Sequence, residues 1–93
     1  MPQVVWSPAA LAQLRAIRLY IEQFNPHAAA EVAAHLLNAG NSLENFAHRG
    51  RRVAKTDMRE LVAGYSYVIR YRIARDTVRI LRVRHTSRRP TKP

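Results

Sequence analysis

The spacing of hydrophobic residues changes near the middle of this chain, and the change limits the folds that it can adopt. From residue 8 to residue 46 apolar side chains recur every three or four positions, as along one side of an α-helix. From residue 58 to residue 85 they alternate with polar side chains, as in a β-strand. A chain of 93 residues has room for only one hydrophobic core. We therefore expect a single α+β domain, residues 1–93, in which helices pack on a sheet.

Two helix starts are visible in the first half, each a capping side chain followed by proline. Ser7-Pro8 begins the first helix, and Asn25-Pro26 ends it and begins a second. Small residues in the second helix allow the two helix backbones to approach closely, so we expect an αα-hairpin. The expected apolar stripes are Leu11, Leu14, Ile17, Ile21 and Phe24 in the first helix, and Ala29, Val32, Leu36, Leu43 and Phe46 in the second.

The second half contains three expected strands, which follow a basic loop and precede a tail. A hairpin turn is predicted at Arg75-Asp76. With a short β-run at residues 4–6, the order becomes β-α-α-β-β-β. We expect the helical hairpin to cover one face of a small, mostly antiparallel sheet and to leave the other face open. The loop spans 48–57, the strands span 58–63, 65–74 and 77–85, and the flexible tail spans 86–93.

The last predicted strand does not alternate cleanly. Val78 and Ile80 share one side, whereas Leu81 and Val83 share the other. Either a β-bulge interrupts this strand, or the strand is central and buried on both faces.

Arginines gather on the expected open face of the sheet. A turn at Arg75-Asp76 places Arg72 directly opposite Arg79, with Arg70 nearby. Like charges in this position destabilise a sheet, so we expect an anionic ligand for the cluster. The alternative is that the long side chains extend into water and cover apolar surface.

The positive charge is confined to the second half of the chain. The net charge is −1 over residues 1–47 and +11 over residues 48–93, which gives +10 in total. Fourteen of the sixteen basic residues are arginine, which suits bidentate contact with carboxylate or phosphate, although a GC-rich genome also favours arginine. The expected partner is a nucleic acid, an anionic surface or an acidic polypeptide. An acidic polypeptide is favoured because the excess charge belongs to the sheet, loop and tail.

Several classes of protein are excluded by what the sequence lacks. It has no cysteine, which excludes disulfide scaffolds, thiol catalysis and cysteine-based zinc sites. Its apolar runs are short and no charged leader precedes one, so we expect no membrane span, no signal peptide and a cytoplasmic location. The four histidines lack metal-ligand spacing and no glycine-rich phosphate loop is present, so we expect no metal and no cofactor.

One residue has the potential for general acid–base chemistry. His85 lies at the end of the last predicted strand, among Arg84, Arg88 and Arg89, which would suit an RNA phosphate. The favoured alternative is a histidine that makes a structural hydrogen bond at the end of the sheet.

A series of short motifs extends along almost the whole chain. The motifs are Trp6–Ala10 followed by Leu14, Ile17–Ile21, Asn25-Pro26 before an alanine-rich helix, Gly50-Arg51, Arg59–Val62, Tyr67–Arg72 and Ile80–His85. Together they resemble the ParE/RelE toxin superfamily. The resemblance implies the toxin of a bacterial type II toxin–antitoxin system. It also implies a ParD-, RelB- or Phd-like antitoxin whose acidic C-terminal segment wraps the toxin, and a higher-order complex of the two proteins.

The superfamily contains two activities. RelE-like members cleave mRNA on the ribosome, whereas ParE-like members inhibit DNA gyrase by binding it. Positions that are basic in RelE-like nucleases hold Leu61 and Val68 here, and Thr86 stands near another such position. The resemblance therefore favours a gyrase inhibitor without catalytic residues. One alternative is a ribosome-dependent endoribonuclease with His85 as acid or base and Arg59 on the scissile phosphate; another is a non-toxic member or a nucleic-acid-binding module.

These expectations assign contact residues to two partners. The residues expected to bind the acidic antitoxin are Arg59, Arg70, Arg72, Arg79 and Arg82. The residues expected to bind the target, which is gyrase or alternatively the ribosome and mRNA, are His85, Arg88 and Arg89.

Overall fold

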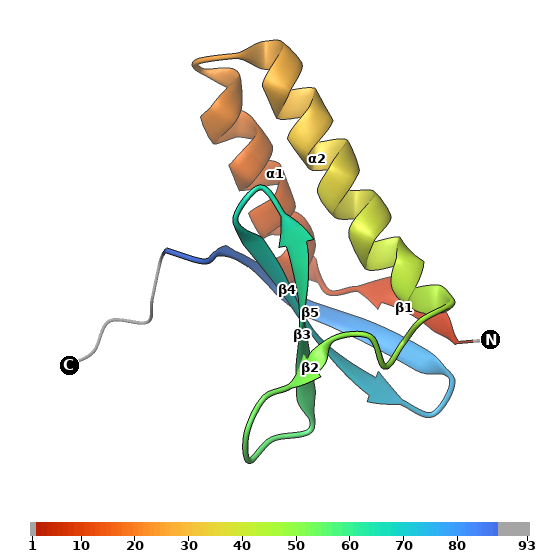
Figure 1. The fold of residues 1–93 in the computed structure, drawn as a ribbon. Helices are drawn as coiled ribbons and strands as arrows, with labels where there is room; N and C mark the ends of the chain where they lie inside the picture. The colour runs from red at the N-terminus through yellow and green to blue at the C-terminus, as the bar shows by residue number, and fades with distance from the viewer. Residues whose placement is uncertain (1, 88–93) are drawn as a thin grey trace.

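The structure is a computed structural model, and it describes residues 2–87. Its elements are β1 (Gln3–Trp6), α1 (Pro8–Glu22), α2 (Pro26–Asn41), the 3-10 helix η1 (Ser42–Glu44), β2 (Arg51–Arg52), β3 (Met58–Gly64), β4 (Tyr67–Ala74) and β5 (Thr77–His85). The helical hairpin packs on one face of a five-stranded sheet (Figure 1). The predicted α+β fold is confirmed, whereas the predicted tail lies outside the described residues from position 88 onward.

Both predicted helix starts are confirmed by their capping hydrogen bonds. The Ser7 hydroxyl accepts a hydrogen bond from the backbone N–H of Ala10 at 3.0 Å. The Asn25 side-chain oxygen accepts one from the backbone N–H of Ala28, also at 3.0 Å. In each case the following proline occupies the first turn, where its missing N–H costs no hydrogen bond.

The strand order in the sheet is β1-β5-β4-β3-β2. β1 runs parallel to β5, and the other three pairs are antiparallel. The segment 48–57 was predicted to be entirely loop, but Arg51 and Arg52 form the edge strand β2 beside β3. A two-residue strand has no alternating pattern of its own, so only its pairing with β3 identifies it.

The two turns of the β3–β4–β5 meander differ in how well the sequence predicted them. The turn at Arg75-Asp76 is confirmed, with Arg75 in the left-handed region at φ 56°. The strand predicted to begin at Tyr65 instead begins at Tyr67, because Tyr65 and Ser66 form the turn with φ values of 54° and 67°. Because non-glycine residues seldom adopt this conformation, a Tyr-Ser pair is not a recognisable turn signal in the sequence.

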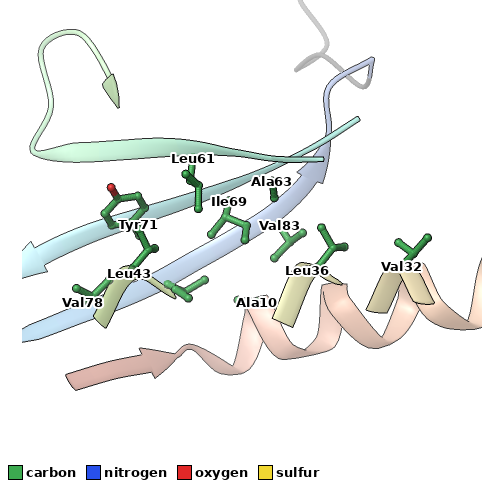
Figure 2. Packing of buried hydrophobic residues seen from close by; sticks show 11 residues of the cluster. Ala10, Val32, Leu36, Leu43, Leu61, Ala63, Ile69, Tyr71, Val78 and Val83 are labelled. Carbon is green, nitrogen blue, oxygen red and sulfur yellow. The ribbon is translucent and has the colours of Figure 1, made fainter. Parts of the chain in front are cut away.

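The hydrophobic core lies between the helices and the sheet (Figure 2). Its largest fully buried side chains come from every layer of the fold: Tyr71, Leu36, Leu43, Ile69, Ile80 and Val78. The predicted stripes are correct at Ala29, Val32, Leu36 and Leu43, which are buried. They are wrong at Leu11, Phe24 and Phe46, which are 48%, 72% and 61% exposed. Phe24 follows the end of α1 and Phe46 follows η1, and the tip of the helical hairpin extends beyond the sheet (Figure 1).

Gly40 of α2 packs closely against side chains of β1 and β5. A Cβ atom at this position would overlap the indole ring of Trp6 and would lie 2.9 Å from the end of the Ile80 side chain. A side chain at position 40 would therefore collide with the sheet.

Candidate functional site

The side chains of β4 divide between the core and the open face of the sheet. Ile69 and Tyr71 belong to the core. Because successive side chains of a strand point to opposite faces, Arg70 and Arg72 lie on the face turned away from the helices.

A β-bulge adds two further arginines to this open face. The pairing between β4 and β5 shifts so that Leu81 is an extra residue in β5. Ile80 lies in the core, and strict alternation would turn Arg82 toward the core as well. The bulge instead brings Val83 into the core, at 3% exposure, and leaves Arg82 and Arg84 on the open face. The bulge is therefore the explanation of the irregular pattern. β5 is also a central strand, between β1 and β4, but it is not buried on both faces, because Arg79 and Arg82 are exposed.

The arginines form a ladder across β4 and β5. Arg72 lies opposite Arg79, as predicted, and Arg70 lies opposite Arg82. Glu60 of β3 lies on the other side of Arg70. We call this surface the arginine face, and it comprises Glu60, Arg70, Arg72, Arg79, Arg82 and Arg84.

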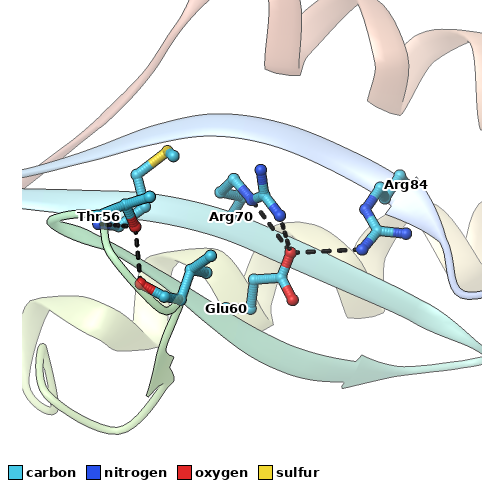
Figure 3. A network of polar contacts seen from close by, with 6 residues as sticks. Thr56, Glu60, Arg70 and Arg84 are labelled. Atoms are coloured by element: carbon cyan, nitrogen blue, oxygen red, sulfur yellow. Dashed lines mark hydrogen bonds and ion pairs between the residues drawn. The ribbon is translucent and has the colours of Figure 1, made fainter. Parts of the chain in front are cut away.

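One carboxylate holds two of these arginines. The Glu60 Oε2 atom accepts hydrogen bonds from Arg70 Nη2 at 2.6 Å and Arg70 Nε at 3.0 Å, and lies 3.4 Å from Arg84 Nη2 (Figure 3). The Glu60 side chain is only 10% exposed. Burial raises the pKa of Glu60, but the hydrogen bonds and charges of Arg70 and Arg84 outweigh this and hold it below its usual value of 4.5. Glu60 is therefore ionised at neutral pH.

The other arginines of the face differ in their partners. Arg72 pairs with Asp57 at 3.0 Å, and both side chains of this pair are substantially exposed. Among residues 2–87, neither Arg79 nor Arg82 has a hydrogen bond or an ion pair through its side chain. These two guanidinium groups are therefore available to an external anion.

The arginine face also has a hollow with both apolar and basic lining residues. Its volume is about 330 Å³. It is lined by Met58, Arg70, Leu81, Arg82 and Arg84. The bulge residue Leu81 contributes apolar floor between guanidinium groups, so the hollow suits an apolar side chain with carboxylates on either side of it.

Arg59 lies apart from the other arginines predicted to bind the antitoxin. Its strand position turns it to the helix side of the sheet, where its Nη1 atom donates to the backbone oxygens of Gly50 at 2.8 Å and His48 at 3.3 Å. The buried hydroxyl of Tyr71 holds the same loop, accepting from the Gly50 N–H at 2.8 Å and donating to the Ala47 oxygen at 2.7 Å. Burial raises the pKa of Tyr71 above its usual value of 10.0, so this hydroxyl keeps its proton.

His85 lies at the opposite end of the sheet. Its ring meets that of Tyr67 edge-on at 5.0 Å, and its Nδ1 atom accepts the backbone N–H of Ser87 at 3.1 Å. It lines a groove of about 400 Å³ between α1 and the end of β5, together with Ile17 and Tyr20. Arg88 and Arg89, predicted to share the target contact, lie outside the described residues.

Arg59 and His85 do not converge on a common centre. Arg59 of β3 lies opposite Tyr71 of β4, and His85 of β5 lies opposite Tyr67 of β4. Four residues along β4 and two strand spacings separate their positions by about 16 Å. Across residues 2–87, moreover, no three His, Cys, Asp or Glu side chains are grouped so that they could hold a metal ion.

A second exposed surface lies on the helical hairpin. A groove between α1 and α2 is lined mainly by leucine and alanine, including Leu11, Leu19 and Leu37, and it carries Arg15 and Arg18. Leu11 was predicted to face the core, but it is 48% exposed in this groove. No helix within the described part of the chain is long and apolar enough to span a membrane.

Comparison with known proteins identifies the family. Residues 4–90 match the family described as "ParE toxin of type II toxin-antitoxin system, parDE". The chain belongs to the ParE toxin family. It is therefore the toxin component of a type II toxin–antitoxin system, with an antitoxin as its partner.

Similar proteins support this membership. The chain is 50% identical over 88 residues to "Toxin RelE2" of Caulobacter vibrioides, covering 95% of this chain and 99% of that protein. It is 42% identical over 84 residues to "Putative toxin Y4kP" of Sinorhizobium fredii, covering 89% and 86% of the two proteins. The "Chromosomal ParDE TA system from P. aeruginosa" contains a chain with the same fold, at a TM-score of 0.87 and 21% identity, covering 94% of this chain and 98% of that one.

Sequence reasoning missed two members of the arginine face of this ParE-family toxin. Arg84 was placed beside His85 as a phosphate ligand, and Glu60 was given no role. The irregular pattern of β5 was the available signal, because a bulge between Ile80 and Arg82 places Arg84 on the open face. Glu60 could have been found as the residue opposite Arg70 once β3 and β4 were paired.

Proposed function

We propose that this ParE-family toxin inhibits DNA gyrase by binding it, and that an acidic segment of its antitoxin neutralises it by lying on the arginine face. Arg79 and Arg82 carry the antitoxin part of this proposal, because no other side chain among the described residues neutralises them. Both events belong in the cytoplasm, where gyrase and the ribosome act.

The arginine face suits an acidic peptide for two reasons. Guanidinium groups form charge-assisted hydrogen bonds with carboxylates, each worth about 1.5–3 kcal/mol when formed in a partly dry interface. The hollow at Met58 and Leu81 also offers apolar contact to a residue between two such carboxylates. A peptide with acidic and apolar residues in alternation meets both requirements.

The groove on the helical hairpin extends the proposed antitoxin surface. Its exposed leucines offer contact to an apolar partner, and Arg15 and Arg18 are the only lysine or arginine residues of the first 47. An amphipathic helix with acidic residues beside its apolar stripe complements this groove in both respects. The antitoxin is therefore proposed to contact both the helices and the sheet.

Inhibition by binding is favoured over catalysis by the separation of Arg59 from His85. A general acid or base must lie within about 3 Å of the proton it transfers, and the phosphate ligand must reach the same group. Here the two residues are about 16 Å apart, and the Arg59 guanidinium is already hydrogen bonded to a loop.

A ribosome-dependent mRNA endoribonuclease is the second candidate function. It is favoured by the name of a relative, "Toxin RelE2", at 50% identity. In that case His85 would act as acid or base and Arg59 would contact the scissile phosphate.

The two functions are separated by assaying both activities with one preparation of purified protein. We expect inhibition of DNA supercoiling by gyrase, relief of that inhibition by the antitoxin, and intact mRNA on translating ribosomes. Neither the wild type nor His85→Ala should cleave mRNA. Codon-dependent mRNA cleavage that His85→Ala abolishes, together with normal gyrase activity, would establish the endoribonuclease instead.

A further inference from the structure

Glu60 occupies an unusual place on a surface that otherwise attracts anions. It belongs to β3, at one side of the arginine face, and its Oε2 atom lies 2.6 Å from Arg70 Nη2 and 3.4 Å from Arg84 Nη2. Its side chain is 10% exposed, whereas those of Arg70 and Arg84 are 29% and 30% exposed. The carboxylate therefore sits lower than the guanidinium groups that it holds.

Without Glu60, the arginine face would resemble a nucleic-acid-binding surface. Arginine side chains that contact successive phosphates release counterions, and this release gives strong binding without sequence preference. Glu60 supplies to Arg70 and Arg84 the anion that a phosphate would otherwise supply. Among the arginines of this face, only Arg79 and Arg82 then have no side-chain partner within residues 2–87.

We propose that Glu60 is an internal counter-ion that makes the arginine face selective for a protein partner with separated carboxylates and weak for the continuous phosphate chain of nucleic acid. A phosphate chain that extends from Arg79 and Arg82 to Arg70 or Arg84 must come close to the Glu60 carboxylate and is repelled there. A peptide avoids this repulsion because it can place carboxylates at Arg79 and Arg82 and an uncharged residue near Glu60. The protein partner in this inference rests on the proposed function, whereas the weakening of nucleic-acid binding does not.

Substitution of Glu60 tests the inference through the salt dependence of nucleic-acid binding. Binding of a fluorescent 12-nucleotide single-stranded DNA is measured at several salt concentrations for the wild type, Glu60→Gln and Glu31→Gln. Glu31→Gln is the control because it makes the same change in net charge at an exposed residue of α2, on the other side of the sheet. Each additional phosphate contact to a single strand steepens the plot of log K against log salt by about 0.7.

We expect Glu60→Gln to steepen this slope by about 0.7–1.4, because it releases one or both of Arg70 and Arg84. Glu31→Gln should raise the affinity slightly through net charge and leave the slope unchanged. Equal slopes for Glu60→Gln and Glu31→Gln, with both proteins folded by circular dichroism, would overturn the proposal.

A pair of arginine variants keeps the proposal testable if Glu60→Gln does not fold. Arg82→Gln removes a guanidinium group that has no partner in the described residues, and it should make the slope shallower by about 0.7. Arg84→Gln removes one that Glu60 already neutralises, and should leave the slope unchanged. Equal reductions in the two variants would contradict the role of Glu60.

The same variants separate this inference from the proposed function. The DNA measurements contain no antitoxin, so they test Glu60 alone. If Arg79→Gln and Arg82→Gln leave antitoxin affinity unchanged, the antitoxin site is wrong even where Glu60 controls DNA binding. If both variants weaken antitoxin binding but Glu60→Gln behaves like Glu31→Gln toward DNA, the antitoxin site stands and the role of Glu60 is wrong.

Discussion

Replacing Arg82 and Arg59 separately by glutamine tests whether the antitoxin binds the arginine face. Both residues were predicted from the sequence to bind the antitoxin, but they lie on opposite faces of the sheet. Arg82 has no side-chain partner among the described residues, whereas Arg59 donates to two backbone oxygens of the loop before β3. The same chemical change should therefore affect binding in one variant and stability in the other.

The expected magnitudes follow from these contacts. A charge-assisted hydrogen bond from Arg82 to an antitoxin carboxylate contributes about 1.5–3 kcal/mol, so its loss should raise Kd by roughly tenfold or more. Arg59→Gln loses one well-formed hydrogen bond, at 2.8 Å, and a longer one at 3.3 Å. Its cost of about 1 kcal/mol should lower Tm by about 4–8 °C in a domain of this size and leave Kd within about twofold.

Isothermal titration calorimetry with the purified antitoxin measures Kd, and differential scanning calorimetry of the toxin alone measures Tm. Titrations at two salt concentrations add a check, because a contact between exposed charges weakens as ionic strength rises. The reasoning is refuted if Arg59→Gln weakens antitoxin binding as much as Arg82→Gln does while its Tm is unchanged.

Three further predictions concern the framework of the face. Tyr71→Phe should lower the free energy of unfolding by about 1–3 kcal/mol in urea titrations, because the buried Gly50 N–H loses its acceptor; a loss below about 0.5 kcal/mol would contradict this. Gly40→Ala should lower Tm measurably by forcing a Cβ atom against Trp6, and an unchanged or higher Tm would mean that β1 gives way without strain. The lowered pKa of Glu60 means that its ion pairs stabilise the folded state above the pKa of the unfolded state. The stability advantage of the wild type over Glu60→Gln should therefore decrease as pH falls below about 4.5, and a constant difference from neutral pH to pH 3 would contradict it.

The sequence predicted the helical part of the fold because the signals there are local. A serine or asparagine cap and the proline after it act within one turn of helix, so both starts were correct. The hairpin turn at Arg75-Asp76 was also correct, and it placed Arg72 opposite Arg79. The stripes failed at Leu11, Phe24 and Phe46, because periodicity identifies one side of a helix but does not show how much of it another element covers.

The candidate site was less predictable because its members come from different strands. Arg59 lies two positions before Leu61 in the same strand and shares the core side with it. Spacing alone did not show which side of β3 faces the helices, so Arg59 was grouped with Arg70. The bulge at Leu81 could be suspected from the sequence, but only the register with β4 located it and turned Arg82 and Arg84 to the open face. The paired edge strand at Arg51 and Arg52 was missed for the same reason.

The sequence by itself determined the α+β class, the helical hairpin, the β3–β4–β5 meander and the concentration of arginine in the second half. These properties depend on residue type and on spacing within single elements, which act before any tertiary contact forms. Only the tertiary structure decided which arginines share a face, which carry a partner already and that Glu60 lies among them. Pairing between strands sets these relations, since a shift of one residue reverses every side chain that follows it.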